Sequence, residues 1–200
     1  RGTYNRGLPV PRFLRSLTAG CVALAAIHGA AAGLPRALDG SPRTAASTQE
    51  REYDVKAAYI FSLLPFTTWP ASAFSSAAAP LTLCIAAPDP FGGALQRTFQ
   101  NERVGSHPVV VTRVTTRDAA RGCHVLFISA AADPDGSLER VVGTAPVLTI
   151  GETARFESRG GLVTFVIEQG RVRFDLNQTA AARVGIQFSS KVLQVARKVS

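Results

Sequence analysis

The chain has 200 residues, with 22 Lys and Arg against 14 Asp and Glu, and its formal net charge is +8 at pH 7. Because residues 1–32 hold four arginines and no acid, the remainder carries only 18 − 14 = +4. Its basic residues are scattered, without a stripe or interleaved aromatic side chains, so the composition gives little support for nucleic-acid binding.

Residues 1–32 have the pattern of a secretory signal peptide. Four arginines precede the apolar run SLTAGCVALAAIHGAAAG, which ends in small residues. The run is short and rich in Ala and Gly for a membrane span, although a retained anchor is the alternative. Cys21 lies in a partial lipoprotein box, but Thr18 stands where a large aliphatic residue is expected. We therefore expect export to the periplasm and cleavage of this segment.

The rest of the chain divides into a leader and one domain. Residues 33–49 contain Pro, Gly and Ser without an apolar period, which predicts a flexible leader. Residues 50–200 have the size of a single domain with a core of its own.

The domain is expected to begin with a helix over residues 50–67, which Pro65 kinks or ends. Its apolar residues near helical spacing are Val55, Ala58, Tyr59, Leu63 and Phe66, with Phe61 fitting less well. Four apolar runs then predict strands at 81–87, 108–114, 123–129 and 146–151. Short helices are predicted between them, the first with Asp89 as N-cap and Pro90 at its first position.

The C-terminal part has a different pattern. Residues 161–177 are two β-like runs separated by EQG, which predicts a hairpin whose second arm is half exposed. A final helix follows, capped by Ser189 or Ser190, with an apolar stripe of Val192, Val195, Ala196 and Val199. The predicted fold is α/β, a mixed, mostly parallel sheet between helical layers (an α/β/α sandwich) with a C-terminal β-hairpin and a final helix.

Motifs of catalysis are missing from the sequence. It has no phosphate-binding or dinucleotide-binding glycine loop and no G-x-S-x-G elbow. Its three histidines and three cysteines do not have metal-ligand spacing. His124 adjoins Cys123, but neighbouring strand positions face opposite sides of a sheet. We therefore expect no catalytic residue, no metal, no cofactor and no enzymatic activity.

Two cysteines lie in predicted strands. Cys84 and Cys123 are 39 positions apart, and the strands that hold them are often neighbours in doubly wound sheets. In an oxidising compartment they could form a disulfide. The alternative is that both are reduced core residues, packing as small hydrophobic side chains.

The loops after the strands line the edge where α/β sheets bind ligands. Residues at this edge are Asp89, Phe91, Gly92, Gly151 and Glu152. Asp89, Phe91 and Glu152 are the candidate ligand residues, and helix capping and turn geometry are the alternative roles for Asp89 and the two glycines.

Several segments together resemble the YfiR family of periplasmic proteins. They are, in order, VKAAYIFSLLPFTTWP, LTLCIAAPDPFG, GCHVLFIS, VLTIGE, FESRGGLVTFVIEQGRVRFDLN and FSSKVLQVARKV. The resemblance implies an α/β/α sandwich, usually dimeric and without catalytic activity. It implies repression of an inner-membrane diguanylate cyclase through that enzyme's periplasmic domain, which lowers cyclic-di-GMP and biofilm formation. It also implies sequestration by an outer-membrane OmpA-like lipoprotein.

The resemblance assigns roles to particular residues. By position, Cys84 and Cys123 correspond to a redox-responsive pair of the family, whereas a second family disulfide near FESRGGLVTF has no cysteines here. For a protein partner, the second hairpin arm and the last helix are the expected surfaces, with polar members Arg173, Asp175, Gln187 and Lys191. These four could equally be ordinary solvated positions. The alternative function is a periplasmic small-molecule binding module that signals to a membrane sensor kinase.

Overall fold

The structure is a computed structural model that describes residues 42–200, except for the side chains of 42–47, 117 and 139–141. The expected signal peptide, Cys21 and most of the expected leader lie outside the described residues. Residues 42–49, expected in the leader, instead form the first turns of a helix.

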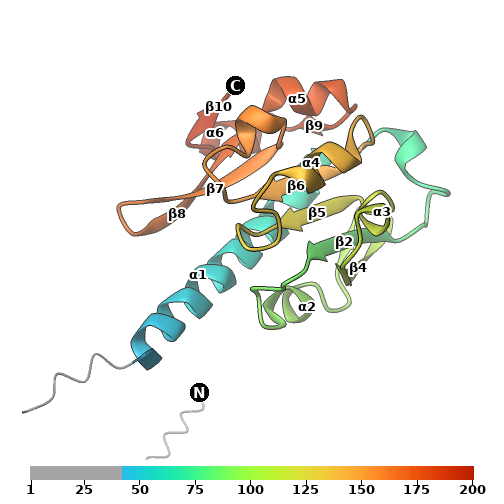
Figure 1. Cartoon of the computed structure of the whole chain (residues 1–200). Helices are drawn as coiled ribbons and strands as arrows, with labels where there is room; N and C mark the ends of the chain where they lie inside the picture. The colour runs from blue at the N-terminus through green and yellow to red at the C-terminus, as the bar shows by residue number, and fades with distance from the viewer. Residues whose placement is uncertain (1–41) are drawn as a thin grey trace, which may run out of the picture. The chain divides into compact units, whose positions relative to one another are not determined.

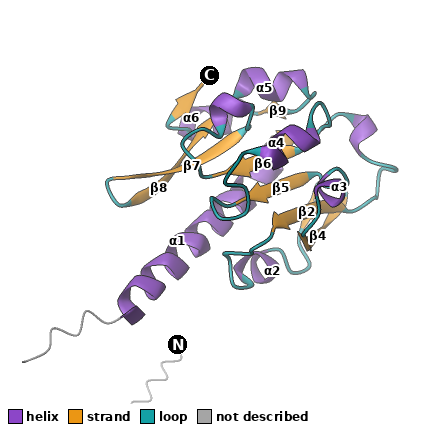
Figure 2. Ribbon diagram, in the orientation of Figure 1, coloured by secondary structure: helices purple, strands orange, loops and turns teal. Residues whose placement is uncertain are grey.

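Helices and strands alternate along most of the described chain (Figures 1 and 2). The helices are α1 (Pro42–Leu63), α2 (Ala94–Thr98), α3 (Arg117–Ala120), α4 (Ser137–Val142), α5 (Gln178–Arg183) and α6 (Ser190–Val195), with 3-10 turns η1 (Leu64–Phe66), η2 (Ala71–Ala73) and η3 (Glu157–Arg159). The strands are β1 (Thr67–Thr68), β2 (Leu81–Ala86), β3 (Arg103–Val104), β4 (His107–Val114), β5 (Val125–Ile128), β6 (Leu148–Gly151), β7 (Val163–Glu168), β8 (Arg171–Leu176), β9 (Gln187–Phe188) and β10 (Lys198–Val199).

Eight of these strands form one mixed sheet in the order β10-β8-β7-β6-β5-β2-β4-β3. The pairs from β4 through β2, β5 and β6 to β7 are parallel, while β7–β8 and β3–β4 are antiparallel. The expected hairpin is β7–β8, and its turn residues Gln169 and Gly170 both have positive φ, as a tight hairpin turn requires. The predicted mixed, mostly parallel α/β sheet with a C-terminal hairpin and a final helix is confirmed.

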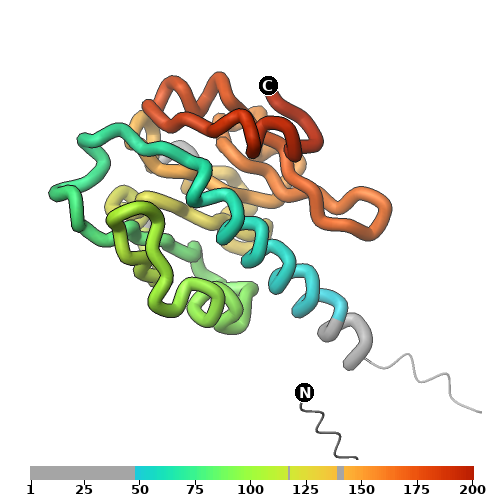
Figure 3. The backbone as a smooth tube through the Cα atoms, turned by 180° about the vertical axis from the view of Figure 1, so that it is seen from behind, coloured from blue at the N-terminus to red at the C-terminus, as the bar shows by residue number. Residues whose placement is uncertain are grey.

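The two faces of the sheet have separate cores. In β2, Leu83 and Ile85 belong to the larger core, which α1, α2 and α5 cover, while Cys84 and Ala86 belong to a smaller core with residues of α3 and α4. This alternation follows from the period of two along a strand that is buried on both faces. Seen from behind, α1 crosses the sheet diagonally (Figure 3).

The buried face of α1 differs from the expected one. Its buried residues are Tyr53, Lys56, Ala57, Ile60 and Leu63, which follow the i, i+3, i+4, i+7 spacing of one helix face. Of the expected stripe only Leu63 is buried, and Val55, Ala58, Phe61 and Phe66 are exposed. The expected face was wrong because the prediction considered apolar residues alone, whereas the buried face includes Lys56.

The helix after β2 also begins later than expected. Helix α2 starts at Ala94 after Gly93, so Asp89 and Pro90 are not its cap and first residue. The Asp89 carboxylate instead accepts a hydrogen bond from the amide of Phe91 at 2.8 Å, which stabilises a turn.

The final helix is shorter than the predicted stripe requires. Helix α6 ends at Val195, and β10 then pairs in parallel with Asp175 and Leu176 of β8. Val195 and Val199 are exposed, and only Val192 of the stripe is buried. Sequence periodicity missed β10 because a two-residue strand has too few side chains to show a period.

Candidate functional site

The carboxyl edge of the sheet holds the first candidate site. Strand β2 lies between β4 and β5 in the sheet. The chain passes from β2 to β4 on one side and then returns to β5 on the other, so the strand order reverses between β2 and β5. Open α/β sheets commonly bind ligands in the crevice at such a point. Here, side chains of α1 lie over this edge.

Glu152, directly after β6, is the centre of a polar cluster. Its carboxylate accepts hydrogen bonds from the Tyr53 hydroxyl at 2.9 Å and from the Ala130 amide at 3.0 Å. The Lys56 ammonium lies 2.5 Å from Glu152 and 2.5 Å from Glu52, one turn earlier in α1. The Lys56 and Glu152 side chains are only 4% and 11% exposed. The cluster therefore ties α1 to the ends of β5 and β6.

The electrostatics of this cluster suit a structural role, in which its side chains hold α1 on the sheet. Burial raises the pKa of Tyr53, and the negative charge of Glu152 raises it further, so the phenol stays protonated and keeps donating. The Lys56 ammonium also lies 4.4 Å from the centroid of the Tyr53 ring, a cation–π contact. Glu152 was predicted from the sequence as a site residue, whereas Tyr53 and Lys56 were not. The sequence signal that could have indicated them was Lys56, a charged residue at a core-facing position of an amphipathic helix.

The other two ligand candidates lie elsewhere on this edge. Phe91 is buried and packs edge-to-face with Tyr53 and with Phe127. Asp89 forms a salt bridge with Arg113 at 2.7 Å. Asp89 and Phe91 line a cavity of 560 Å³ and Glu152 lines a different one of 340 Å³, so the structure does not bring the three into one pocket.

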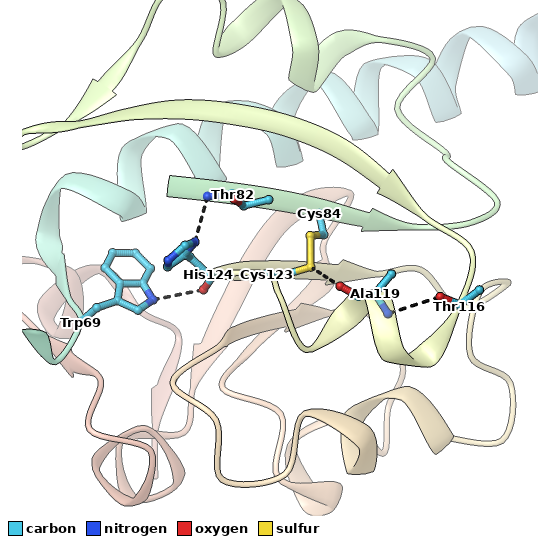
Figure 4. Close-up of a disulfide and its surroundings, with 7 residues drawn as sticks. All are labelled: Trp69, Thr82, Cys84, Thr116, Ala119, Cys123 and His124. Atoms are coloured by element: carbon cyan, nitrogen blue, oxygen red, sulfur yellow. Dashed lines mark hydrogen bonds between the residues drawn. A yellow bond between two sulfur atoms is a disulfide. The ribbon is translucent and has the colours of Figure 1, made fainter. Parts of the chain in front are cut away.

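A disulfide links the central strands (Figure 4). Cys84 of β2 and Cys123, just before β5, are joined with their Cα atoms 5.9 Å apart, and both residues are buried. The Cys123 sulfur lies 3.5 Å from the Ala119 carbonyl oxygen. Because an oxidised sulfur carries no proton, this is a packing contact with α3 rather than a donated hydrogen bond.

His124 follows the disulfide and holds the loop after η2. Its Nδ1 accepts from the Thr82 amide at 3.0 Å, and its Nε2 lies 3.0 Å from the Ala73 carbonyl oxygen. Phe74 stacks against His124 and His107, with centroid distances of 4.5 and 3.8 Å. This arrangement requires a neutral imidazole with its proton on Nε2.

Three of the four expected partner-binding residues are exposed. Arg173 is exposed on β8, but Asp175 is buried, and its carboxylate accepts from Arg197 Nε at 2.8 Å. The expected exposure of Asp175 was wrong, because β10 pairs beside it and Arg197, just before β10, covers it. Gln187 of β9 and Lys191 of α6 are exposed, and the Lys191 ammonium lies 5.5 Å from the Phe66 ring centroid.

Arg173 instead lines a groove between α1 and the hairpin. This α1–hairpin groove has a volume of 510 Å³, and its lining includes Arg51, Val55, Tyr59, Ile167 and Arg173. Val55 and Ile167 are 44% and 53% exposed. The groove was not predicted from the sequence, since its residues on α1 and on the hairpin are more than one hundred positions apart.

Among the side chains that the structure describes, no group of three or more His, Cys, Asp or Glu could hold a metal ion. No helix of residues 42–200 is both long and apolar enough to cross a membrane.

These features define a mixed α/β domain with a disulfide across its central strands and an open groove. At the carboxyl edge of its sheet, here called the polar edge, Glu152 pairs with Tyr53 and Lys56. The chain belongs to the YfiR/HmsC-like family, whose model matches residues 53–197. This is a family of periplasmic regulatory domains, and membership supports a periplasmic regulatory role in general. No curated protein matches the sequence significantly.

One solved structure shares the fold, and a second superposes more loosely. A conserved domain protein from Vibrio cholerae O1 biovar El Tor strain N16961 superposes with a TM-score of 0.50 at 12% identity, over 74% of this chain. The ABC domain in complex with L-Trp from Streptococcus pneumoniae gives a TM-score of 0.45 at 11% identity, over 76% of this chain. The match spans 60% of the length of each of these two proteins.

Proposed function

We propose that this protein is a periplasmic, non-enzymatic repressor of an inner-membrane diguanylate cyclase and acts by binding the periplasmic domain of that enzyme. The observation that carries the proposal is the family match over residues 53–197. The polar edge of the sheet supports it, because Glu152 is engaged by Tyr53 and Lys56 rather than open to a substrate. Active repressor would lower cyclic-di-GMP and biofilm formation.

Such a repressor works by differential binding. It must bind the inactive cyclase more tightly than the active one, because equal affinity for two states shifts no population. Moving an equilibrium from 1:99 to 99:1 takes a preference of about 10⁴-fold. A rigid domain with an exposed binding surface can supply this preference without chemistry of its own.

Further parts of the proposal concern assembly and redox state. We include a homodimer, and sequestration by an outer-membrane OmpA-like lipoprotein that relieves repression. The Cys84–Cys123 disulfide would modulate the stability of the domain rather than react with a partner, because both residues are buried. Reduction would then lower the amount of folded repressor.

Gene deletion tests the proposal. We expect cyclic-di-GMP and surface attachment to rise in the deletion strain and to return to the original level when the full chain is restored. Unchanged cyclic-di-GMP would contradict the proposal. Crosslinking of the full chain in membranes distinguishes the alternative, since recovery of a sensor kinase in place of a cyclase would favour a ligand-reporting module.

A further inference from the structure

The α1–hairpin groove exposes apolar side chains that the described chain leaves uncovered. Val55 of α1 and Ile167 of β7 lie at this groove, each close to half exposed. Val172, the cross-strand neighbour of Ile167, lines the groove as well. Neighbouring exposed apolar side chains from separate elements are a common mark of an interaction surface.

The groove also has an excess of positive charge. Three arginines line it: Arg51, Arg171 and Arg173. None of them has an ion-pair partner among the described residues. Glu52, the acid of the lining, is paired with Lys56, and Glu168 opposite Arg171 lies 3.7 Å from Arg197. Complementary charge therefore favours an acidic partner.

An unpaired strand edge lies along the same groove. Strand β10 pairs with β8 only at Asp175 and Leu176, and the Arg197 amide donates to the Phe174 carbonyl. Outward-facing backbone groups alternate along an edge strand, so Val172 presents its amide and carbonyl to this same edge. No strand of residues 42–200 pairs with β8 at Val172 on that side. An open edge of this kind can accept an added strand.

We propose that the α1–hairpin groove binds an acidic, extended segment of a partner protein, which adds as a strand to β8 at Val172. An apolar side chain of the segment packs against Val172 and Val55. Its carboxylates pair with the three groove arginines. The inference deepens the proposed function, on which it rests, by giving the chemistry of the segment that the partner supplies.

The test uses the full chain, labelled with ¹⁵N, and a synthetic octapeptide of alternating Glu and Val. We expect the amide of Val172 to shift and to become protected from exchange when the peptide is added. Binding should weaken as salt is raised, because the ion pairs are exposed. The same peptide with Lys in place of Glu should not bind.

Two comparisons separate strand addition from simple charge attraction. An octapeptide of the same charge, N-methylated at alternate residues, lacks the donors of a ladder and should bind about tenfold or more weakly. Arg51→Glu and Arg173→Glu should each weaken binding of the acidic peptide by about two- to fivefold or more. Arg183→Glu, at an arginine that is exposed on α5 and lies outside the groove, is the matched control and should bind as the unchanged chain does.

Three outcomes overturn the inference. The first is no shift at Val172 with about millimolar acidic peptide, and the second is equal binding of the N-methylated form. Sedimentation of the full chain gives a third, since a dimer that Arg51→Glu converts to monomer would assign the groove to a second copy. If the peptide binds but gene deletion leaves cyclic-di-GMP unchanged, the groove inference stands and the proposed repression of a cyclase is wrong.

Discussion

Lys56 is a buried lysine whose charge is balanced by two carboxylates. It lies between Glu52 and Glu152, and Glu152 also accepts from Tyr53 and Ala130. A buried ion pair adds little net stability, but removal of one partner leaves an uncompensated buried charge. Lys56 thus keeps α1 in one register on the sheet.

Lys56→Met should lower the free energy of unfolding by about 3 kcal/mol, because Glu152 then stays buried without its cation. Adding Glu152→Gln should restore part of that loss, since the amide carries no charge and can still accept from Tyr53. Urea denaturation of the single and double variants measures both effects. Lys191→Met, at an exposed lysine, is the control. Additive losses would contradict a coupled pair.

His124 makes stability depend on pH. Burial lowers the pKa of His124, and the nearby His107 lowers it further, while the hydrogen bond to Ala73 acts in the opposite direction. The folded state therefore favours the neutral ring. Protonation would turn the Nδ1 acceptor into a donor that faces the Thr82 amide.

We expect unfolding free energy to fall as pH drops below about 6.5, the value of an unperturbed histidine, toward the lower pKa of folded His124. In that window the unfolded chain binds more protons, by at most one per His124, so the slope is at most about 1.4 kcal/mol per pH unit. Denaturation at pH 7 and pH 5 measures it. His124→Gln should remove this slope, and His107→Gln should keep most of it, because burial is the larger cause of the lowered His124 pKa. An unchanged slope in His124→Gln would exclude His124 as its source.

At the scale of elements, the disulfide joins two parallel strands whose order in the chain is not their order in the sheet. Cys84 and Cys123 close a loop of 39 positions between β2 and the start of β5. Such a crosslink restricts the unfolded chain by roughly 3 to 4 kcal/mol in the entropic account.

The double variant Cys84→Ala, Cys123→Ala should therefore lose about 3 kcal/mol of unfolding free energy. Dithiothreitol should destabilise the unchanged chain and leave the double variant unaffected. Urea denaturation with and without the reductant gives both numbers. Equal stability of the oxidised chain and the double variant would show that the crosslink contributes nothing.

The segment between β6 and β7 packs through one aromatic ring. Phe156 lies so close to the backbone of Gly151 and Gly161 that an added Cβ would fall 2.4 and 2.1 Å from the ring. Gly161→Ala should therefore destabilise the domain by about 1 to 3 kcal/mol through overpacking. Gly122→Ala is the control, because its Cβ would meet nothing closer than 3.7 Å. Thermal unfolding compares them, and equal midpoints would refute the close contact.

At the scale of the whole molecule, the polar edge of the sheet and the α1–hairpin groove have different roles. The charged groups of the edge pair with one another and fix α1 on the sheet. The groove leaves three arginines without ion-pair partners among the described residues and two apolar side chains exposed. A regulator that catalyses no reaction needs this combination of a rigid scaffold and an exposed binding surface.

In cells, Arg51→Glu combined with Arg173→Glu should fail to lower cyclic-di-GMP in the deletion strain, because both charges repel an acidic partner. Arg183→Glu should restore the low level. Immunoblots of periplasmic fractions confirm equal amounts of each chain. Full repression by the double variant would exclude the groove as the regulatory surface.

The order of helices and strands followed from sequence because it depends on local patterns. The runs around Cys84 and Cys123 are continuous and apolar, as strands buried on both faces are, and EQG carries a hairpin turn. Glu152 was named for the same reason, since it directly follows a predicted strand.

Long-range pairing decided the rest. Asp175 alternates with buried residues and was expected to face solvent, yet β10 and Arg197 cover it from 22 positions away. The buried register of α1 depended on Glu152, 96 positions from Lys56, and the groove on a hairpin still further along the chain. Periodicity reports which side of an element is apolar. Only packing decides which charged residue finds a partner and which apolar residue stays uncovered.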